Sequence, residues 1–214
     1  MRFTVTPLCP SLRRWLPALS AVWLLAGCAT NPVTGESDYV LMSEQQEVAL
    51  GQRYNRQILK EMPPYEDAKL NDLVQSIGEQ LAAHSHRQGL DYSFTIVDSP
   101  TVNAFALPGG YIYITRGMLA YLNSEAELAA VLGHEIGHVT ARHSVRQHSA
   151  QTTASVVGAV VSVATGIQGV DDLTDMAGTA IVRGYGREHE LEADRLGAQY
   201  MARSGYDPDA MLEV

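Results

Sequence analysis

Cysteine is scarce in this sequence of 214 residues, which contains only Cys9 and Cys28. Domains held together by several disulfides and zinc modules built from cysteine ligands are therefore excluded. Basic residues are also few, because 15 Lys and Arg stand against 24 Asp and Glu and leave a formal net charge of −9. This balance excludes a general electrostatic attraction to nucleic acid or to anionic lipid.

Apolar runs long enough to cross a membrane are absent too. The run at residues 15–26 contains 12 residues, which is too short for a helix to span a hydrocarbon core of roughly 30 Å. Residues 152–167 are small and apolar but also too few, and they predict a buried or covering helix. Hydrophobic residues still make up 46% of the chain, so we expect one domain with a sizeable core.

The first 28 residues have the pattern of an export signal. Arginines at positions 2, 13 and 14 precede the apolar run, which ends in Leu25-Ala26-Gly27-Cys28. This ending resembles the lipobox of bacterial lipoproteins, in which the cysteine is lipidated and becomes the first residue of the mature chain. The alternative is an ordinary signal peptide followed by a chance cysteine. We predict a lipoprotein signal peptide at 1–27 and a lipidated tether at 28–42.

Export would leave 187 residues with a formal charge of −12, because residues 1–27 contain three arginines and no acid. Ala29, rather than Asp, follows the cysteine. By resemblance to Gram-negative lipoproteins, this favours a periplasmic protein anchored to the outer membrane. A single acyl chain binds a membrane only marginally, so a stable anchor requires two or three chains on Cys28.

The rest of the chain combines helical periodicity with three short strands. Serines at positions 43 and 124 open capping-box patterns, and a break in the last long helix is expected near Gly184 or Gly186. Strands are expected at 92–97, 102–107 and 111–115, with a turn at 108–110. Helices are expected at 44–60, 66–85, 125–148, 172–204 and 209–214.

The motif His134-Glu135-Ile136-Gly137-His138 lies inside the helix expected at 125–148. Residues four apart share a helix face with Cβ atoms about 5–6 Å apart, so the two histidines can bind one zinc ion. Glu135 can face the open position of the metal and take a proton from water there. Gly137 allows a neighbouring element to approach this face closely. An exposed helix that happens to carry two histidines is the alternative.

A catalytic zinc site needs a third protein ligand. A third histidine at the spacing of the extended motif is absent, because Ala141 and Ser144 occupy those positions. A later helix offers Glu190 as the zinc ligand, with Glu188 as a rival. Asp194 shares the face of Glu190 and is expected to accept a hydrogen bond from a ligand imidazole. A solvated, charged helix face is the alternative.

Two neighbouring residues are expected to lie outside this site. Glu192 points away from it by helical geometry. His143 falls on the face of the 125–148 helix opposite to His134 and is interpreted as structural or solvated.

The segment 103–110 (NAFALPGG), the His-Glu-x-x-His motif and Glu190-x-x-Ala193-Asp194 together resemble the HtpX-type and CAAX-prenyl-protease-type zinc metallopeptidases, which are gluzincins. The soluble periplasmic lipoprotein branch is the most similar, and residues 31–35 also fit it. The resemblance covers nearly all of the mature chain. The expected fold is α+β, a mostly helical zincin-like metallopeptidase domain at 43–214. A small antiparallel sheet would lie over the motif helix, and the Glu190 helix would close the site.

The resemblance implies His134, His138 and Glu190 as zinc ligands, Glu135 as general base and Asp194 as their outer hydrogen-bond partner. In such proteins one strand borders the cleft, and an extended substrate can add to its edge through main-chain hydrogen bonds. Here the substrate edge strand would comprise Asn103, Ala104, Phe105 and Ala106.

Some expectations from the resemblance leave alternatives open. For the side chains of Phe105 and Leu107, core packing is the favoured role. Family members continue beyond the equivalent of Val214, so we expect a truncated domain. The group that stabilises an oxyanion is not determined, and the candidates nearby in sequence are Tyr185, Arg187 and His189.

The expected function is that of an endopeptidase with one zinc ion per chain, and the resemblance implies misfolded or stalled envelope proteins as substrates. The alternative is a chaperone-like binding module for outer-membrane protein assembly, with latent protease activity and residues 152–167 as a lid. An inert structural zinc domain is disfavoured, because structural sites use four protein ligands. Expected partners are unfolded or misfolded envelope proteins, the membrane through lipid on Cys28, and the outer-membrane assembly machinery.

Overall fold

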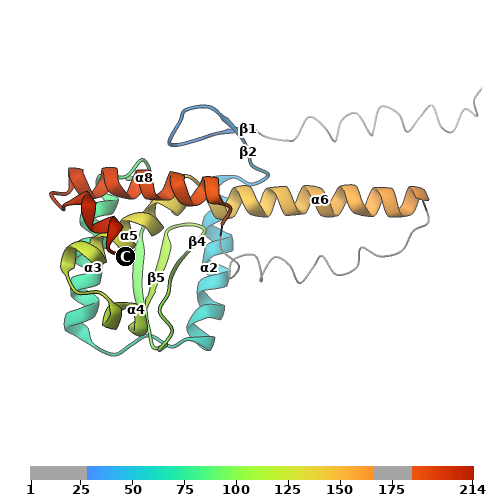
Figure 1. Ribbon diagram of the computed structural model, residues 1–214. Coiled ribbons are helices and arrows are strands. Elements are labelled where there is room, and N and C mark those ends of the chain that lie inside the picture. The colour runs from blue at the N-terminus through green and yellow to red at the C-terminus, as the bar shows by residue number, and fades with distance from the viewer. Residues whose placement is uncertain (1–27, 166–184) are drawn as a thin grey trace, which may run out of the picture.

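The computed structural model describes residues 28–165 and 185–214 (Figure 1). Its sheet consists of β3 (Ser93–Val97), β5 (Tyr111–Thr115) and β4 (Ala104–Leu107), in that spatial order. The α+β class and the three expected strands are confirmed. The sheet is mixed rather than wholly antiparallel, because β5 pairs in parallel with β3 and antiparallel with β4.

The order of the strands explains this difference. A tight turn joins β4 to β5, and both of its glycines, Gly109 and Gly110, adopt positive φ angles of 79° and 92°, which glycine tolerates without steric cost. The chain leaves β3 for the outer position and returns through the centre as β5. Strand β4 therefore forms one edge of this three-stranded sheet.

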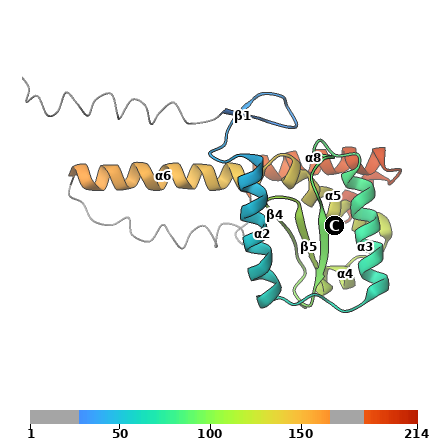
Figure 2. The same ribbon diagram turned by 180° about the vertical axis from the view of Figure 1, so that it is seen from behind.

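Helices surround the sheet (Figures 1 and 2). Helix α3 packs on β3 and α5, α5 packs on β4, and α8 crosses α5. The capping box expected at the start of α2 is confirmed, with reciprocal bonds between Ser43 and Gln46. The helices are α2 (Glu44–Glu61), α3 (Ala68–Ala82), α4 (Arg116–Tyr121), α5 (Glu125–Thr140), α6 (His143–Thr165) and α8 (Arg187–Arg203), followed by the 3-10 helix η3 (Pro208–Leu212).

One hydrophobic core joins the sheet to α3, α5 and α8. The apolar positions of α5 point inward as their spacing predicts, and Leu132 and Ile136 are fully buried. They pack with sheet and α8 residues, among them Ile96, Ile114 and Leu196. The sheet, α5 and α8 therefore share one core, which sets their relative positions.

Helix α5 ends at Thr140, so the prediction of one helix through residue 148 is wrong. Arg142 adopts a left-handed conformation with φ 57°, and α6 begins immediately afterwards at His143. Such a conformation is strained for a residue with a side chain. The guanidinium of Arg142 donates a 2.8 Å hydrogen bond to the buried carboxylate of Glu47, which holds the break in place.

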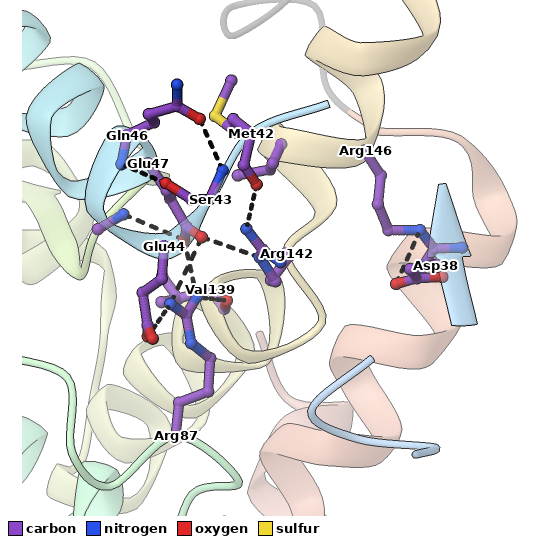
Figure 3. A network of polar contacts seen from close by, with 12 residues as sticks. Asp38, Met42, Ser43, Glu44, Gln46, Glu47, Arg87, Val139, Arg142 and Arg146 are labelled. Atoms are coloured by element: carbon purple, nitrogen blue, oxygen red, sulfur yellow. Dashed lines mark hydrogen bonds and ion pairs between the residues drawn. The ribbon is translucent and has the colours of Figure 1, made fainter. Parts of the chain in front are cut away.

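Arg142 belongs to a group that we call the arginine cluster: Glu44, Glu47, Arg87 and Arg142 (Figure 3). Arg87 donates to Glu47 at 2.7 Å, to Glu44 at 2.8 Å and to the carbonyl of Val139 at 3.1 Å. The side chains of Arg87, Arg142 and Glu47 are almost fully buried. The cluster therefore ties α2 to the C-terminal end of α5.

Helix α6 extends away from the body of the domain in both views (Figures 1 and 2). Residues 151–156 alternate between half-buried and exposed, and Val156 is exposed. The described part of this segment therefore contradicts the prediction of a buried or covering helix. Among the described residues, no helix has the length and apolar character needed to cross a membrane.

The two ends of the described chain contain elements that the sequence did not predict. Within the predicted tether, residues 28–39 form a hairpin of β1 (Cys28–Thr30) and β2 (Ser37–Tyr39). The buried Asn31 organises its turn by accepting hydrogen bonds from the backbone of Val33 and Thr34. The C-terminal segment is the 3-10 helix η3 rather than an α-helix. Helix α8 begins directly after its N-cap Gly186. Residues 1–27 and 166–184 lie outside the described part, so the predicted break near Gly184 or Gly186 stays a prediction.

Candidate metal centre

Two glycines let α8 cross α5 at close range. A Cβ atom at Gly137 would lie 2.7 Å from the carbonyl oxygen of Ala193, and one at Gly197 would lie 2.9 Å from the carbonyl carbon of Gly133. Neither helix could approach so closely with larger residues there. The role expected for Gly137 is thus confirmed, and the close crossing brings Glu190 opposite the two histidines of α5.

Three ligand atoms converge at this crossing, from the residues that we call the ligand cluster: His134, His138 and Glu190. Their atoms all lie within 4.8 Å of one another. The two Nε2 atoms are 2.9 Å apart, and Oε2 of Glu190 lies 3.4 Å from the first and 3.8 Å from the second. Ligands of a tetrahedral zinc ion are about 3.3 Å from one another, given bonds near 2.0–2.1 Å. The donor set and its spacing therefore fit zinc.

The atoms on the far side of each ligand already have partners. Nδ1 of His134 donates to Oδ1 of Asp194 at 2.8 Å, and Nδ1 of His138 lies 2.9 Å from Nδ1 of His143. Oε1 of Glu190 accepts a 3.2 Å hydrogen bond from the backbone N–H of Tyr185. The other nitrogen or oxygen of each ligand faces the centre. Within the described residues the rival Glu188 is exposed and outside the group.

Glu135 lies next to the ligand cluster and is buried. Burial raises the pKa of Glu135 to about 7; the nearby Glu190 carboxylate adds to this and the charge of His134 opposes it. A carboxyl group with a pKa near neutrality can both accept and return a proton. Burial also lowers the pKa of His138 to about 2, aided by neighbouring imidazoles, so this ring is neutral, as a metal ligand must be.

Two adjoining hollows border this centre, with volumes of about 430 and 270 Å³. Both are lined by His134, Glu135, Asn103 and Ala104. The larger hollow is also bordered by Phe105 and Ala106, so all four residues predicted for the substrate edge lie beside it. Within the described residues, no other strand pairs with the outer edge of β4. The side chain of Phe105 stacks on Tyr113, with ring centroids 4.8 Å apart, as its expected packing role requires.

The three oxyanion candidates lie in different surroundings. Tyr185 borders the larger hollow, and its ring stacks on His138 with centroids 4.1 Å apart. Burial raises the pKa of Tyr185 to about 12, and its hydroxyl pairs with Ser144, so it stays protonated. His189 instead stacks on His143 at 4.3 Å, and Arg187 is exposed. Of the three, Tyr185 is in contact with a ligand.

The structure connects His143 with Glu192, although the sequence placed both residues outside the site. His143 is fully buried, and its Nε2 lies 3.1 Å from Oε2 of Glu192. From the sequence, His143 is interpreted as structural or solvated, on the face of a continuous helix opposite to His134. The ring is buried, and the break at Arg142 turns it back toward His138. Glu192 does point away from the ligand cluster, yet it is connected to it through His143. The proximity of His143 to the motif is the only signal in the sequence for this connection.

Residues 68–214 match the sequence model of peptidase family M48. The chain belongs to this family. Beta-barrel assembly-enhancing proteases of Yersinia pestis and Escherichia coli K12 are each 34% identical to it, over 84% and 85% of this chain. The mitochondrial metalloendopeptidase OMA1 of Arabidopsis thaliana is 36% identical over 59% of the chain and 26% of that protein. This M48 chain spans about two-fifths (39%) of the length of the two bacterial relatives.

Membership of M48 confirms the predicted relation to a zinc metallopeptidase family. The matched region includes the sheet, α5 and α8, so it contains the whole ligand cluster and Glu135. The individual roles of these residues and of the β4 edge remain predictions. Lipidation of Cys28, the first residue of β1, also remains a prediction.

Proposed function

We propose that this M48 chain is a zinc-dependent endopeptidase that hydrolyses peptide bonds by attack of water. The observation that carries the proposal is the convergence of two imidazole nitrogens and one carboxylate oxygen within 4.8 Å, next to the buried Glu135. Zinc held by three protein ligands keeps an open position, polarises a carbonyl oxygen and lowers the pKa of water. Three protein ligands favour a catalytic site over a structural one, which uses four.

Glu135 acts as the general base of this reaction. Its carboxylate removes a proton from the attacking water and later gives that proton to the departing amine. Burial raises the pKa of Glu135 toward neutrality, and an efficient base has a pKa near the working pH. Asp194 holds the ring of His134 in place through its 2.8 Å hydrogen bond.

The edge of β4 binds the substrate as an added strand. Main-chain hydrogen bonds to Asn103, Ala104, Phe105 and Ala106 would hold an extended peptide across the larger hollow and next to Glu135. Such binding depends little on side chains and requires an extended chain. It therefore favours unfolded substrates.

Misfolded or stalled envelope proteins are the substrates that we propose, together with a periplasmic location at the outer membrane. The bacterial relatives are named for enhancing beta-barrel assembly, which supports both proposals and a link to the assembly machinery. The Leu25–Cys28 ending supports a lipid anchor on Cys28. Replacement of Cys28 by Ser should release the protein from the membrane fraction, and retention there would contradict the anchor.

Replacement of Glu135 by Gln tests the proposed chemistry. The parent should bind about one zinc ion per chain and cleave unfolded casein, whereas Glu135→Gln should bind zinc but cleave about 10²–10⁴-fold more slowly. Glu188→Gln is the matched control, because Glu188 is exposed on α8 and outside the ligand cluster. Equal cleavage by Glu135→Gln and the parent would refute the mechanism. Rescue of a deletion strain by Glu135→Gln would instead favour the chaperone-like alternative.

A further inference from the structure

The two histidines of the ligand cluster are supported in different ways. His134 faces a carboxylate directly, since its Nδ1 lies 2.8 Å from Asp194. His138 faces a second imidazole, since its Nδ1 lies 2.9 Å from Nδ1 of His143. His143 in turn contacts Glu192 at 3.1 Å. His138, His143 and Glu192 thus form a row of contacts that leads from the ligand cluster to a carboxylate on α8.

We propose that His143 is a positioning residue that fixes the orientation and the tautomer of His138 by linking it to Glu192. The proposal rests on the proposed function, in which Nε2 of His138 binds the metal. It assigns a role to a buried residue that lies outside the ligand set.

The hydrogen-bonding capacity of imidazole determines the direction of this row of contacts. A neutral imidazole has one N–H donor and one acceptor nitrogen. If Nε2 of His138 offers its lone pair to a metal, its Nδ1 carries the hydrogen and donates to Nδ1 of His143. The hydrogen of His143 must then be on Nε2, which donates to the carboxylate of Glu192. One tautomer of each ring satisfies every contact in the row.

The surroundings of His143 hold it in this geometry. The ring is fully buried and stacks on His189, with centroids 4.3 Å apart and planes 18° apart. At the far end, Nη1 of Arg146 lies 3.4 Å from Oε2 of Glu192, and Nε of Arg146 lies 3.8 Å from Asp38 in β2. Oε2 of Glu192, the acceptor on which His143 depends, therefore has two partners, His143 and Arg146.

The geometry of α8 explains why an intermediate ring is needed. Glu190, Glu192 and Asp194 follow one another at two-residue spacing, so Glu192 points to a different side of the helix from the other two. Asp194 can reach His134 directly, whereas Glu192 reaches His138 only through His143. One helix thus provides a metal ligand and the terminal carboxylate behind each histidine. Outer partners of this kind typically contribute 10–100-fold to metal affinity.

Two substitutions of His143 distinguish positioning from packing. His143→Leu fills the space but removes the acceptor, whereas His143→Asn can place an amide oxygen near the position of Nδ1. We expect zinc affinity, measured by chelator competition, to fall about 10–100-fold in His143→Leu and to recover most of this loss in His143→Asn. A packing role predicts the opposite order, because a buried amide is tolerated less well than leucine. His148→Leu on the same helix is the control and should bind zinc like the parent.

The outcomes separate this proposal from the proposed function. A folded His143→Leu variant with the zinc affinity of the parent would overturn the positioning role and leave the endopeptidase proposal intact. If the parent itself binds no zinc, the proposed function fails first. Should His143→Leu not fold, Glu192→Leu replaces it: several-fold weaker zinc binding would support the row of contacts, and unchanged binding would overturn it.

Discussion

The ligand cluster is built partly from α5, and the arginine cluster contacts the C-terminal end of the same helix. The charges of the two clusters are arranged differently. In the arginine cluster, Glu47 lies between the guanidinium groups of Arg87 and Arg142 at 2.7 and 2.8 Å, so opposite charges alternate (Figure 3). In the ligand cluster, three lone-pair donors converge within 4.8 Å. The arginine cluster is complete with the protein's own residues, whereas the ligand cluster needs an added cation to balance it.

This difference has a consequence for stability. Removal of one partner from a buried ion pair leaves an uncompensated charge and costs several kcal/mol. Removal of the Glu190 carboxylate costs little when no metal is bound, because its side chain is 40% exposed and solvent screens its contact with His134. The arginine cluster at the C-terminal end of α5 is therefore sensitive to the loss of any buried partner, whereas the ligand cluster gains stability only on binding.

The largest effect is expected from Glu47→Gln. The substitution leaves the buried guanidinium group of Arg142 without a counter-charge and leaves Arg87 with only the exposed Glu44, so the free energy of unfolding should fall by about 3–5 kcal/mol. Urea unfolding followed by circular dichroism measures this change. Glu61→Gln, at the exposed end of the same helix, is the control and should change stability by less than about 0.5 kcal/mol. A loss below about 1 kcal/mol in Glu47→Gln would mean that the cluster is not a structural one.

An intermediate effect is expected from zinc. At a free concentration about 100-fold above its dissociation constant, zinc should stabilise the parent by about 2.7 kcal/mol, because it binds only the folded state. Glu190→Gln should have nearly the stability of the parent without metal but should lose most of this increment. Thermal unfolding with zinc and with chelator measures both quantities. Glu47→Gln, although less stable, should keep its zinc-dependent increment; if it does not, the two clusters are not independent.

The contrast between the clusters also marks what the sequence could predict. The ligand cluster was predictable because its spacing is local: His134 and His138 are four apart, and so are Glu190 and Asp194, which places each pair on one helix face. The long-range step, that the two helices meet, was suggested by Gly137 and by the family resemblance. The structure adds the matching Gly197 on α8.

The arginine cluster was not predictable in the same way. The bonds between its members span up to 95 residues, as from Arg142 to Glu47, and no local pattern indicates such a contact. Arg142 is neither Gly nor Pro, so its residue type does not mark the break between α5 and α6. The contact with Glu47 holds this break in place. Without the break, the position of His143 could not be derived. The mixed sheet was missed for a similar reason, because the parallel pairing of β3 with β5 skips over β4.

The smallest change in the free energy of unfolding is expected from Glu44→Gln, because Glu44 is the exposed member of the arginine cluster. Glu44 accepts a 2.8 Å bond from Arg87, but its side chain is 66% exposed, so solvent screening limits the contribution to less than about 1 kcal/mol. The bond from Arg87 lowers the pKa of Glu44 from its usual 4.5. The contribution is therefore complete above the unfolded-state pKa and is lost as the pH falls through the lower, folded-state value.

Parent and Glu44→Gln should accordingly differ slightly in unfolding free energy at pH 7 and converge in acid. Urea unfolding at a series of pH values between 7 and 3 measures the convergence. The small size of the difference matters as much as its direction, since Glu44 and Glu47 bind the same guanidinium group and differ mainly in burial. If Glu44→Gln were as destabilising as Glu47→Gln, burial would not explain how much each glutamate of this cluster contributes to stability.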